Sequence, residues 1–160
     1  MNFTELVENR KEKNDRMRIY IQNSYDLYNS FFQTDYTYND EEALEELGIE
    51  SELIHQLLED FAIQIIESNA TLYRDIALLK ADKLNNKELD FTPFRNEIHK
   101  NLGVSRNLRV KDSIEILTEL MIATDFKRIE LLLEVFEACA LKLKPIQAYE
   151  TLLILRKKVI

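Results

Sequence analysis

The amino-acid sequence predicts an all-α protein, an up-down antiparallel four-helix-type bundle with additional N-terminal and C-terminal helices. Glycine and proline, which interrupt helices, each occur only twice among 160 residues. Apolar residues recur at spacings of three and four, as one face of a helix requires. Short connections between the expected helices favour antiparallel neighbours. We divide the chain into residues 1–39, an N-terminal amphipathic helix and linker, and residues 40–160, the bundle with its extra C-terminal helix.

The N-terminal helix is expected over residues 2–32, with a solvated first half. Residues 8–16 are mostly charged, whereas the second half carries an apolar and aromatic stripe. The stripe comprises Tyr20, Ile21, Tyr25, Tyr28 and Phe32. Packing of this helix on the bundle is the simplest interpretation. Docking to a partner, or formation of a homodimer through this helix, are the alternatives.

Two helices are expected next, over residues 40–47 and 51–83, after a linker at residues 33–39. Gly48 ends the first helix, and Ser51 is expected to cap the second. The core stripe of the long helix comprises Ile54, Leu58, Phe61, Ile65, Leu72, Ile76 and Leu79. Residues 40–60 contain nine acidic residues and no Lys or Arg. We interpret this run as solvated surface, with orientation against a basic partner as the alternative.

Residues 93–110 are the most informative stretch of the chain. Thr92 and Pro93 predict a helix start, because Thr can accept from the first free N–H groups and Pro is tolerated in the first turn. The apolar stripe that follows comprises Phe94, Ile98, Leu102, Ser105 and Leu108. His99 lies beside this stripe and is expected at the surface. Gly103 lies one turn further along; a mid-helix glycine costs roughly 1 kcal/mol relative to alanine, so a packing or contact reason for it is expected.

His99 is expected to lie in a local cationic patch. Residues 93–111 hold five basic residues against one acid, Glu97, in a chain whose net charge is −8. The basic residues are Arg95, Lys100, Arg106, Arg109 and Lys111. An imidazole nitrogen is a competent nucleophile near neutral pH, and phosphoryl transfer needs in-line access with cations near the phosphoryl oxygens. The stretch therefore predicts a histidine that carries a phosphoryl group.

Residues 99–109 read His-Lys-Asn-Leu-Gly-Val-Ser-Arg-Asn-Leu-Arg. They resemble the signature of the histidine-containing phosphotransfer (HPt) family, His-x-Leu-Lys-Gly followed by an apolar helix continuation that often ends in Asn-Leu-Gly. His99, Gly103 and the later Asn-Leu pair match this signature. Asn101 stands where the family has a buried Leu, and Leu102 where it has a Lys on the phosphate side.

The resemblance implies a phosphorelay intermediate rather than a stand-alone enzyme. His99 would accept a phosphoryl group from an aspartyl phosphate on a receiver domain and pass it to another receiver. Lys100, Arg95 or Arg106 would replace the missing Lys, and Gly103 would leave room for the partner. The expected partner is a response-regulator receiver domain or a hybrid histidine kinase. No cofactor is expected on this chain, because the receiver supplies the Mg²⁺.

The resemblance covers roughly residues 40–143. Residues 47–61 resemble the entry into the second helix of these bundles and give a second point of likeness. Asp112 and Ser113 offer a cap for a helix that ends near Thr124, with a core stripe of Ile114, Leu117, Leu120 and Met121. Asp125 is expected to cap a helix over residues 126–143. Pro145 then opens a last helix, over residues 146–158, outside the family core.

Several other classes of protein are disfavoured. His55 and His99 are far apart in sequence and the only cysteine is Cys139, so neither a metal site nor a disulfide is expected. His55 is expected to be structural or on the surface, and Cys139 to be core. The acidic balance argues against nucleic-acid binding. The chain shows no apolar run long enough for a membrane span and no signal peptide, so we expect a cytoplasmic protein.

Two alternative functions remain open at this point. The chain could be a non-catalytic helical adaptor that keeps the bundle for docking and has lost transfer, which Leu102 would suggest. It could also be an unrelated helical sensor or secretion chaperone whose aromatic N-terminal helix provides the binding surface. A nucleotide-binding enzyme is disfavoured because two glycines cannot build a phosphate loop.

Overall fold

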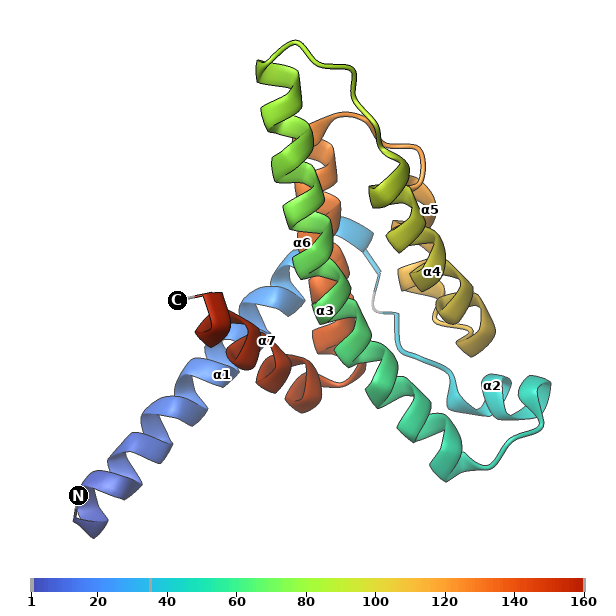
Figure 1. Ribbon diagram of the computed structural model, residues 1–160. Helices are drawn as coiled ribbons and strands as arrows, with labels where there is room; N and C mark the ends of the chain where they lie inside the picture. The colour runs from blue at the N-terminus through green and yellow to red at the C-terminus, as the bar shows by residue number, and fades with distance from the viewer. Residues whose placement is uncertain (1, 35, 160) are drawn as a thin grey trace.

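The computed structural model describes residues 2–34 and 36–159, with side chains described as far as residue 156. Over these residues the chain forms seven α-helices and no strand (Figure 1). They are α1 (Phe3–Phe32), α2 (Asp40–Leu47), α3 (Ser51–Leu84), α4 (Thr92–Leu108), α5 (Lys111–Leu120), α6 (Phe126–Leu143) and α7 (Pro145–Val159). The prediction of an all-α helical bundle is confirmed. Met1, Asp35 and Ile160, which the expected segments include, lie outside the described residues.

Helices α3 to α6 form the bundle that holds the candidate site. Each packs against the next in sequence, and α6 returns to pack against α3. The four helices run alternately up and down in Figure 1 because the connections between them are short. Apolar side chains from all four fill the interior; the largest that are fully buried include Phe61, Phe94, Ile98, Ile116, Leu117 and Phe136.

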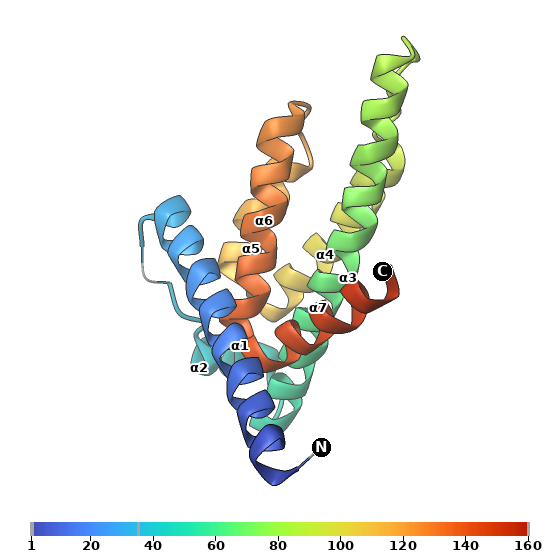
Figure 2. The same ribbon diagram turned by 90° about the vertical axis from the view of Figure 1, so that its left-hand side faces the viewer.

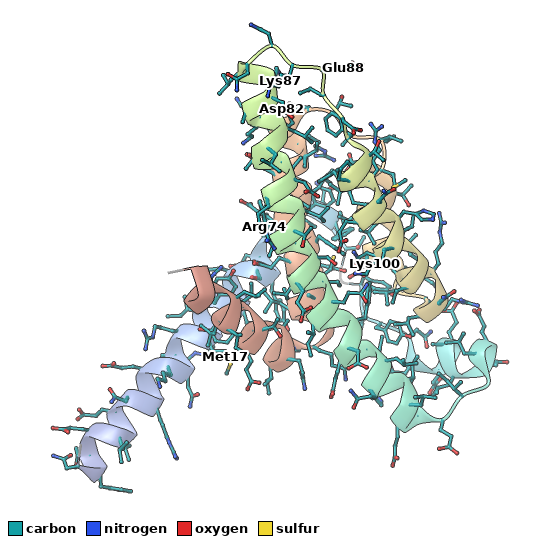
Figure 3. The ribbon with its side chains drawn as sticks, viewed as in Figure 1. Met17, Arg74, Asp82, Lys87, Glu88 and Lys100 are labelled. Carbon is teal, nitrogen blue, oxygen red and sulfur yellow. The ribbon has the colours of Figure 1, made fainter. Side chains whose placement is uncertain are left out.

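The other helices pack on the outside of this bundle. The second half of α1 lies along α6 (Figure 2), and its Tyr28 belongs to the same core. Helix α7 packs against α3 and α6, and α2 packs against α3. Residues 3–14 of α1 are exposed, and Met17, labelled in Figure 3, is one of the first half-buried residues along the helix. Only the second half of α1 is therefore attached to the body of the protein.

The helix boundaries follow the sequence closely, and the expected caps are confirmed in part. Gly48 and Asp125 occupy the cap positions of α2 and α6, although Asp125 makes no side-chain hydrogen bond there, whereas the other expected caps are wrong. Ser51 is the first residue of α3 rather than its cap, and the cap position, Glu50, makes no side-chain hydrogen bond there. Thr92 is likewise the first residue of α4, and its N–H donates to the Asp90 carboxylate over 3.0 Å. The cap position of α4, Phe91, likewise makes no side-chain hydrogen bond, so composition fixes a helix start only approximately.

Helix α5 departs most from the sequence-based expectation. Its cap position is Val110, so Asp112 and Ser113 lie within the first turn, where both are buried. The helix ends at Leu120 instead of near Thr124. Ile116, which the expected stripe omitted, is fully buried, whereas Ile114 is only half-buried. The buried stripe of α5 differs from the expected one because the helix begins at Lys111 and the polar residues of its first turn face the core.

Within the described residues, no helix is long and apolar enough to cross a lipid bilayer.

Candidate functional site

His99 lies on the outer face of α4. The side chains of Ile98 and Leu102 point into the core, which leaves His99 exposed, as its position beside the apolar stripe predicts. Among the described residues, no hydrogen bond or ion pair involves the His99 ring. The imidazole is therefore open to a reactant from outside the molecule.

Gly103 makes the surface beside His99 open as well. It lies one helical turn after His99, on the same face and exposed. Apart from its chain neighbours and the backbone of its own helix, a Cβ atom placed on Gly103 would have no heavy atom within 4 Å. Packing within the chain therefore gives no reason for the glycine, although it costs the helix roughly 1 kcal/mol relative to alanine. The packing reason expected from the sequence is therefore not found, and the contact reason stays a prediction.

The five basic residues do not form one patch. Lys100 is 59 % exposed, with its Nζ 3.6 Å from a Glu97 carboxylate oxygen, and Arg106 is exposed. The Arg95 guanidinium instead lies over the Phe91 ring, 5.2 Å from its centroid, and the Arg95 Nε is buried without a hydrogen-bond partner. Arg95 is therefore committed to packing at the start of α4.

The last two basic residues are bound by acids of α2. Arg109 pairs with Glu46, and the Lys111 Nζ lies 3.0 Å from a Glu42 oxygen. Part of the acidic run over residues 40–60 thus neutralises the C-terminal end of the expected patch. The outer face of α4 keeps Arg106 and Lys100, the latter paired with Glu97 of the same helix; with His99 and Gly103 we call them the His99 face.

A buried polar network sets the rotation of α4 on α3. Asn101 is fully buried, and its Nδ2 donates to the Ser68 Oγ and to the Glu97 carbonyl, over 2.9 Å each. Its Oδ1 accepts from Gln64 over 3.0 Å, and the Ser68 hydroxyl donates to the Glu97 carboxylate over 2.7 Å. These bonds hold Asn101 inward and so keep His99 outward. Sequence reasoning missed the network, since Asn101 registers only as a departure from the family pattern.

Another polar group is buried where α1, α5 and α6 meet. The Tyr28 hydroxyl donates to one Asp112 carboxylate oxygen, and the Ser113 N–H donates to the other, over 2.7 Å each. Cys139 is buried beside them, as its expected core role requires. Burial raises the pKa of Asp112 and of the Cys139 thiol. We call Tyr28, Asp112, Ser113 and Cys139 the Asp112 cluster.

A cavity of about 260 Å³ is lined by Asp112 of this cluster and by His55. The His55 Nε2 is 3.6 Å from an Asp40 carboxylate oxygen, and its Nδ1 is 3.4 Å from the Lys144 Nζ. These contacts connect the starts of α2 and α3 to the end of α6. His55 therefore has partners within the chain, in contrast to His99.

No group of three or more His, Cys, Asp or Glu side chains that could hold a metal ion is found over residues 2–34 and 36–156.

The chain matches no protein-family model, no curated protein and no solved structure. Its function is therefore inferred from its own residues and their geometry.

Proposed function

We propose that this protein is a histidine phosphotransfer protein of a two-component phosphorelay. His99 accepts a phosphoryl group from an aspartyl phosphate on a receiver domain and passes it to another receiver. One observation carries the proposal: an exposed imidazole without hydrogen-bond or ion-pair partners in the described part of the chain lies one turn from a glycine that no internal contact requires. The bundle of α3 to α6 supports the proposal, since packing against its neighbours fixes the position of α4, which carries His99.

The transfer step needs only one reacting group from this chain. An imidazole nitrogen of His99 attacks the phosphorus atom, an N–P bond forms, and the P–O bond to the receiver's aspartate breaks. The aspartate leaves as a carboxylate, and the other ring nitrogen keeps its proton. The receiver holds the Mg²⁺ that offsets charge on the phosphoryl oxygens. The reverse step, onto the aspartate of a second receiver, regenerates free His99.

Lys100 and Arg106 are the side chains that would stabilise the phosphoryl group from this chain. Both are exposed on α4, whereas Leu102, at the position of the family's Lys, is buried in the core. Arg95 contributes less than the sequence suggests because its guanidinium lies over Phe91. Gly103 leaves space for the receiver to approach along the attack direction. We place this relay in the cytoplasm, where the buried thiol of Cys139 stays reduced.

Transfer of label from a phosphorylated receiver tests the proposal. The chain should acquire acid-labile, base-stable label, and His99→Gln should acquire none. His55→Gln is the matched control, because the chain has two histidines and His55 is held by Asp40 and Lys144. Label that persists in His99→Gln would assign the chemistry to another residue.

A non-catalytic adaptor is the second candidate function. It is favoured by the burial of Leu102 and by the pairing of Arg109 and Lys111 with α2, which together reduce the cations near His99. In that case a receiver would bind the chain and His99→Gln equally well, and neither would acquire label.

We also propose that a second copy of the chain covers the first half of α1. Residues 2–14 are exposed, and Phe3, at 80 %, and Leu6, at 49 %, present apolar side chains to solvent. A helix without tertiary contacts is only marginally stable in water. Glu5 and Glu8 come first along this segment, and a mostly basic run, residues 10–13, follows with Glu12 as its one acid. Antiparallel pairing would bring the first acids of one copy to the basic run of the other.

Sedimentation equilibrium tests this pairing. The chain should form dimers at micromolar concentration, and Leu6→Asp should be monomeric. Ile122→Asp, which changes an exposed apolar residue outside α1, should leave the dimer intact. A monomeric parent chain would contradict the proposed homodimer.

A further inference from the structure

An open groove runs along α6, between α1 and α3. Helix α6 contacts both of these helices, which lie on either side of it in Figure 2, and α7 packs against all three. The groove consists of two adjoining hollows, of about 460 and 390 Å³. Tyr73 of α3, Glu137 of α6 and Arg156 of α7 line both hollows. We call the two hollows together the α6 groove.

The lining of the α6 groove repeats with the helical turn. On α1 the side chains that line the larger hollow are three or four positions apart, on one face of the helix: Tyr20, Asn23, Ser24 and Leu27. The smaller hollow has apolar walls from α3 and α7: Ile66, Ala70, Leu152 and Leu155. A helix laid along the groove would meet such a lining at each of its own turns, because it has the same repeat.

Three carboxylates of α6 follow the groove. Glu134 and Glu137 line it, and Glu130 lies on the same face of α6 one turn closer to its start. Like charges at spacings of three and four destabilise a helix. Partial burial raises the pKa of Tyr73, and the charges of these three carboxylates raise it further. The carboxylates therefore face the α3 wall of the groove, where they repel one another.

Two of the three carboxylates have partners within the chain. Glu130 pairs with Lys80 of α3, and the Glu137 carboxylate accepts from the Tyr20 hydroxyl over 2.8 Å. Glu134, between them, is exposed and has no hydrogen bond or ion pair among the described residues. The groove thus presents one unpaired negative charge at its centre.

Arg156 supplies a positive charge at the α7 end of the groove. Its guanidinium donates to the Tyr20 hydroxyl over 2.7 Å and lies 5.0 Å from the Tyr20 ring centroid. These contacts hold Arg156 against α1. An occupant of the groove is therefore expected to place its own positive charge away from α7, toward Glu134.

We propose that the α6 groove binds a helix of a partner protein, with an Arg or Lys that faces Glu134 and apolar side chains that face the smaller hollow. The helical form matches the repeat of the lining, and the positive charge complements the unpaired carboxylate. A nucleic acid is disfavoured, because its phosphates would meet Glu134. This site is separate from His99 and does not depend on phosphotransfer.

Two designed peptides provide probes for this groove. Each is an Ala-rich helix of about 15 residues, long enough to form in water, with Leu and Lys alternating along one face. The second peptide has Glu in place of every Lys. Fluorescence anisotropy with the full chain should show the Lys peptide binding at least about tenfold more tightly than the Glu peptide.

Charge reversal within the groove separates docking from general attraction to an acidic chain. Glu134→Lys should weaken binding of the Lys peptide by about tenfold and strengthen binding of the Glu peptide. Glu67→Lys makes the same change in net charge at an exposed residue of α3 outside the groove. It should leave both affinities within about twofold of the parent chain.

A filled groove provides the second arm of the experiment. Asn23→Trp places a large ring in the larger hollow and should abolish binding of the Lys peptide, with thermal unfolding used to confirm that the variant is folded. Asn29→Trp is the matched control, because Asn29 is exposed on the same helix but does not line the groove. His99→Gln should bind the Lys peptide as the parent chain does, which separates this site from the relay.

Four results would overturn the proposal. Equal effects of Glu134→Lys and Glu67→Lys would mean that the peptide follows only the net charge of the chain. Binding that survives in Asn23→Trp would place the helix elsewhere. A dimer of the parent chain that Glu134→Lys dissociates in sedimentation equilibrium would assign the groove to a second copy instead of a partner. Failure of the Lys peptide to bind the parent chain at millimolar concentration would show that the groove is not a docking site.

Discussion

The His99 face and the Asp112 cluster both consist of reactive or polar side chains, yet the fold uses them in opposite ways. In the Asp112 cluster, the hydroxyl of Tyr28 and the N–H of Ser113 satisfy both carboxylate oxygens. On the His99 face, the imidazole has no partner among the described residues, and Gly103 leaves open space beside it. The comparison indicates that the first group stabilises the fold, whereas the second is available to another molecule.

The largest effect on stability is expected from Asp112→Ala. The substitution leaves a buried tyrosine hydroxyl and a buried N–H without an acceptor, and each loss costs about 1–3 kcal/mol. Urea denaturation should therefore show the free energy of unfolding lowered by roughly 3 kcal/mol. A loss below about 0.5 kcal/mol, the usual size for a surface substitution, would remove the contrast between the two regions.

The pH dependence of stability sharpens the same contrast. Burial raises the pKa of Asp112 above its ordinary value of 3.8, against the opposing effects of the Tyr28 and Ser113 hydrogen bonds and the Lys142 charge. The folded state therefore binds more protons than the unfolded state above pH 3.8. Unfolding free energy should fall as the pH rises through the pKa of the folded protein, by at most about 1.4 kcal/mol per pH unit.

Asp112→Asn isolates this carboxyl group, since other carboxyls with raised pKa, such as that of Glu137, are present in both proteins. The difference in unfolding free energy between parent and variant should change with pH over the acidic range. A constant difference would show that Asp112 does not titrate differently in the folded and unfolded states.

Gly103→Ala should separate stability from function on the His99 face. The new methyl group meets nothing within 4 Å, so the better helix former should raise the free energy of unfolding by about 0.5–1 kcal/mol. Under the proposed function, the same methyl should slow transfer from a phosphorylated receiver, because it occupies the space beside His99.

The other glycine provides the matched control. Gly48 ends α2 with a positive φ of 64°, a conformation that favours glycine, so Gly48→Ala should destabilise the protein by about 1 kcal/mol. Opposite signs for the two substitutions are expected in thermal unfolding. If Gly103→Ala also destabilised the protein, an internal role for that glycine would be established.

The smallest effect on stability is expected from His99→Gln. The ring is exposed and without partners in the described part of the chain, so unfolding free energy should change by less than about 0.5 kcal/mol. Transfer of label should nevertheless be lost. Calorimetry and the receiver assay, run on the same preparation, check both halves of this prediction.

The sequence by itself determined the helices and the direction in which His99 points. Helical periodicity and the scarcity of glycine and proline act over a few residues, so they can be interpreted without knowing the fold. Gly48 ended α2 as expected, and His99 is exposed beside its apolar stripe. Caps were predicted less well, because a capping side chain must stand one residue before the helix, and Ser51 and Thr92 are instead the first residues of α3 and α4.

Only the tertiary structure decided which polar groups bind one another within the chain. Tyr28 and Asp112 are 84 positions apart, and no pattern in either segment predicts their hydrogen bond. The sequence predicts Arg95 in the cationic patch, but in the folded protein its guanidinium packs over the Phe91 ring. The α6 groove likewise exists only when α1, α3, α6 and α7 are together. Such pairings depend on how helices rotate and pack against one another, and local sequence patterns do not contain that information.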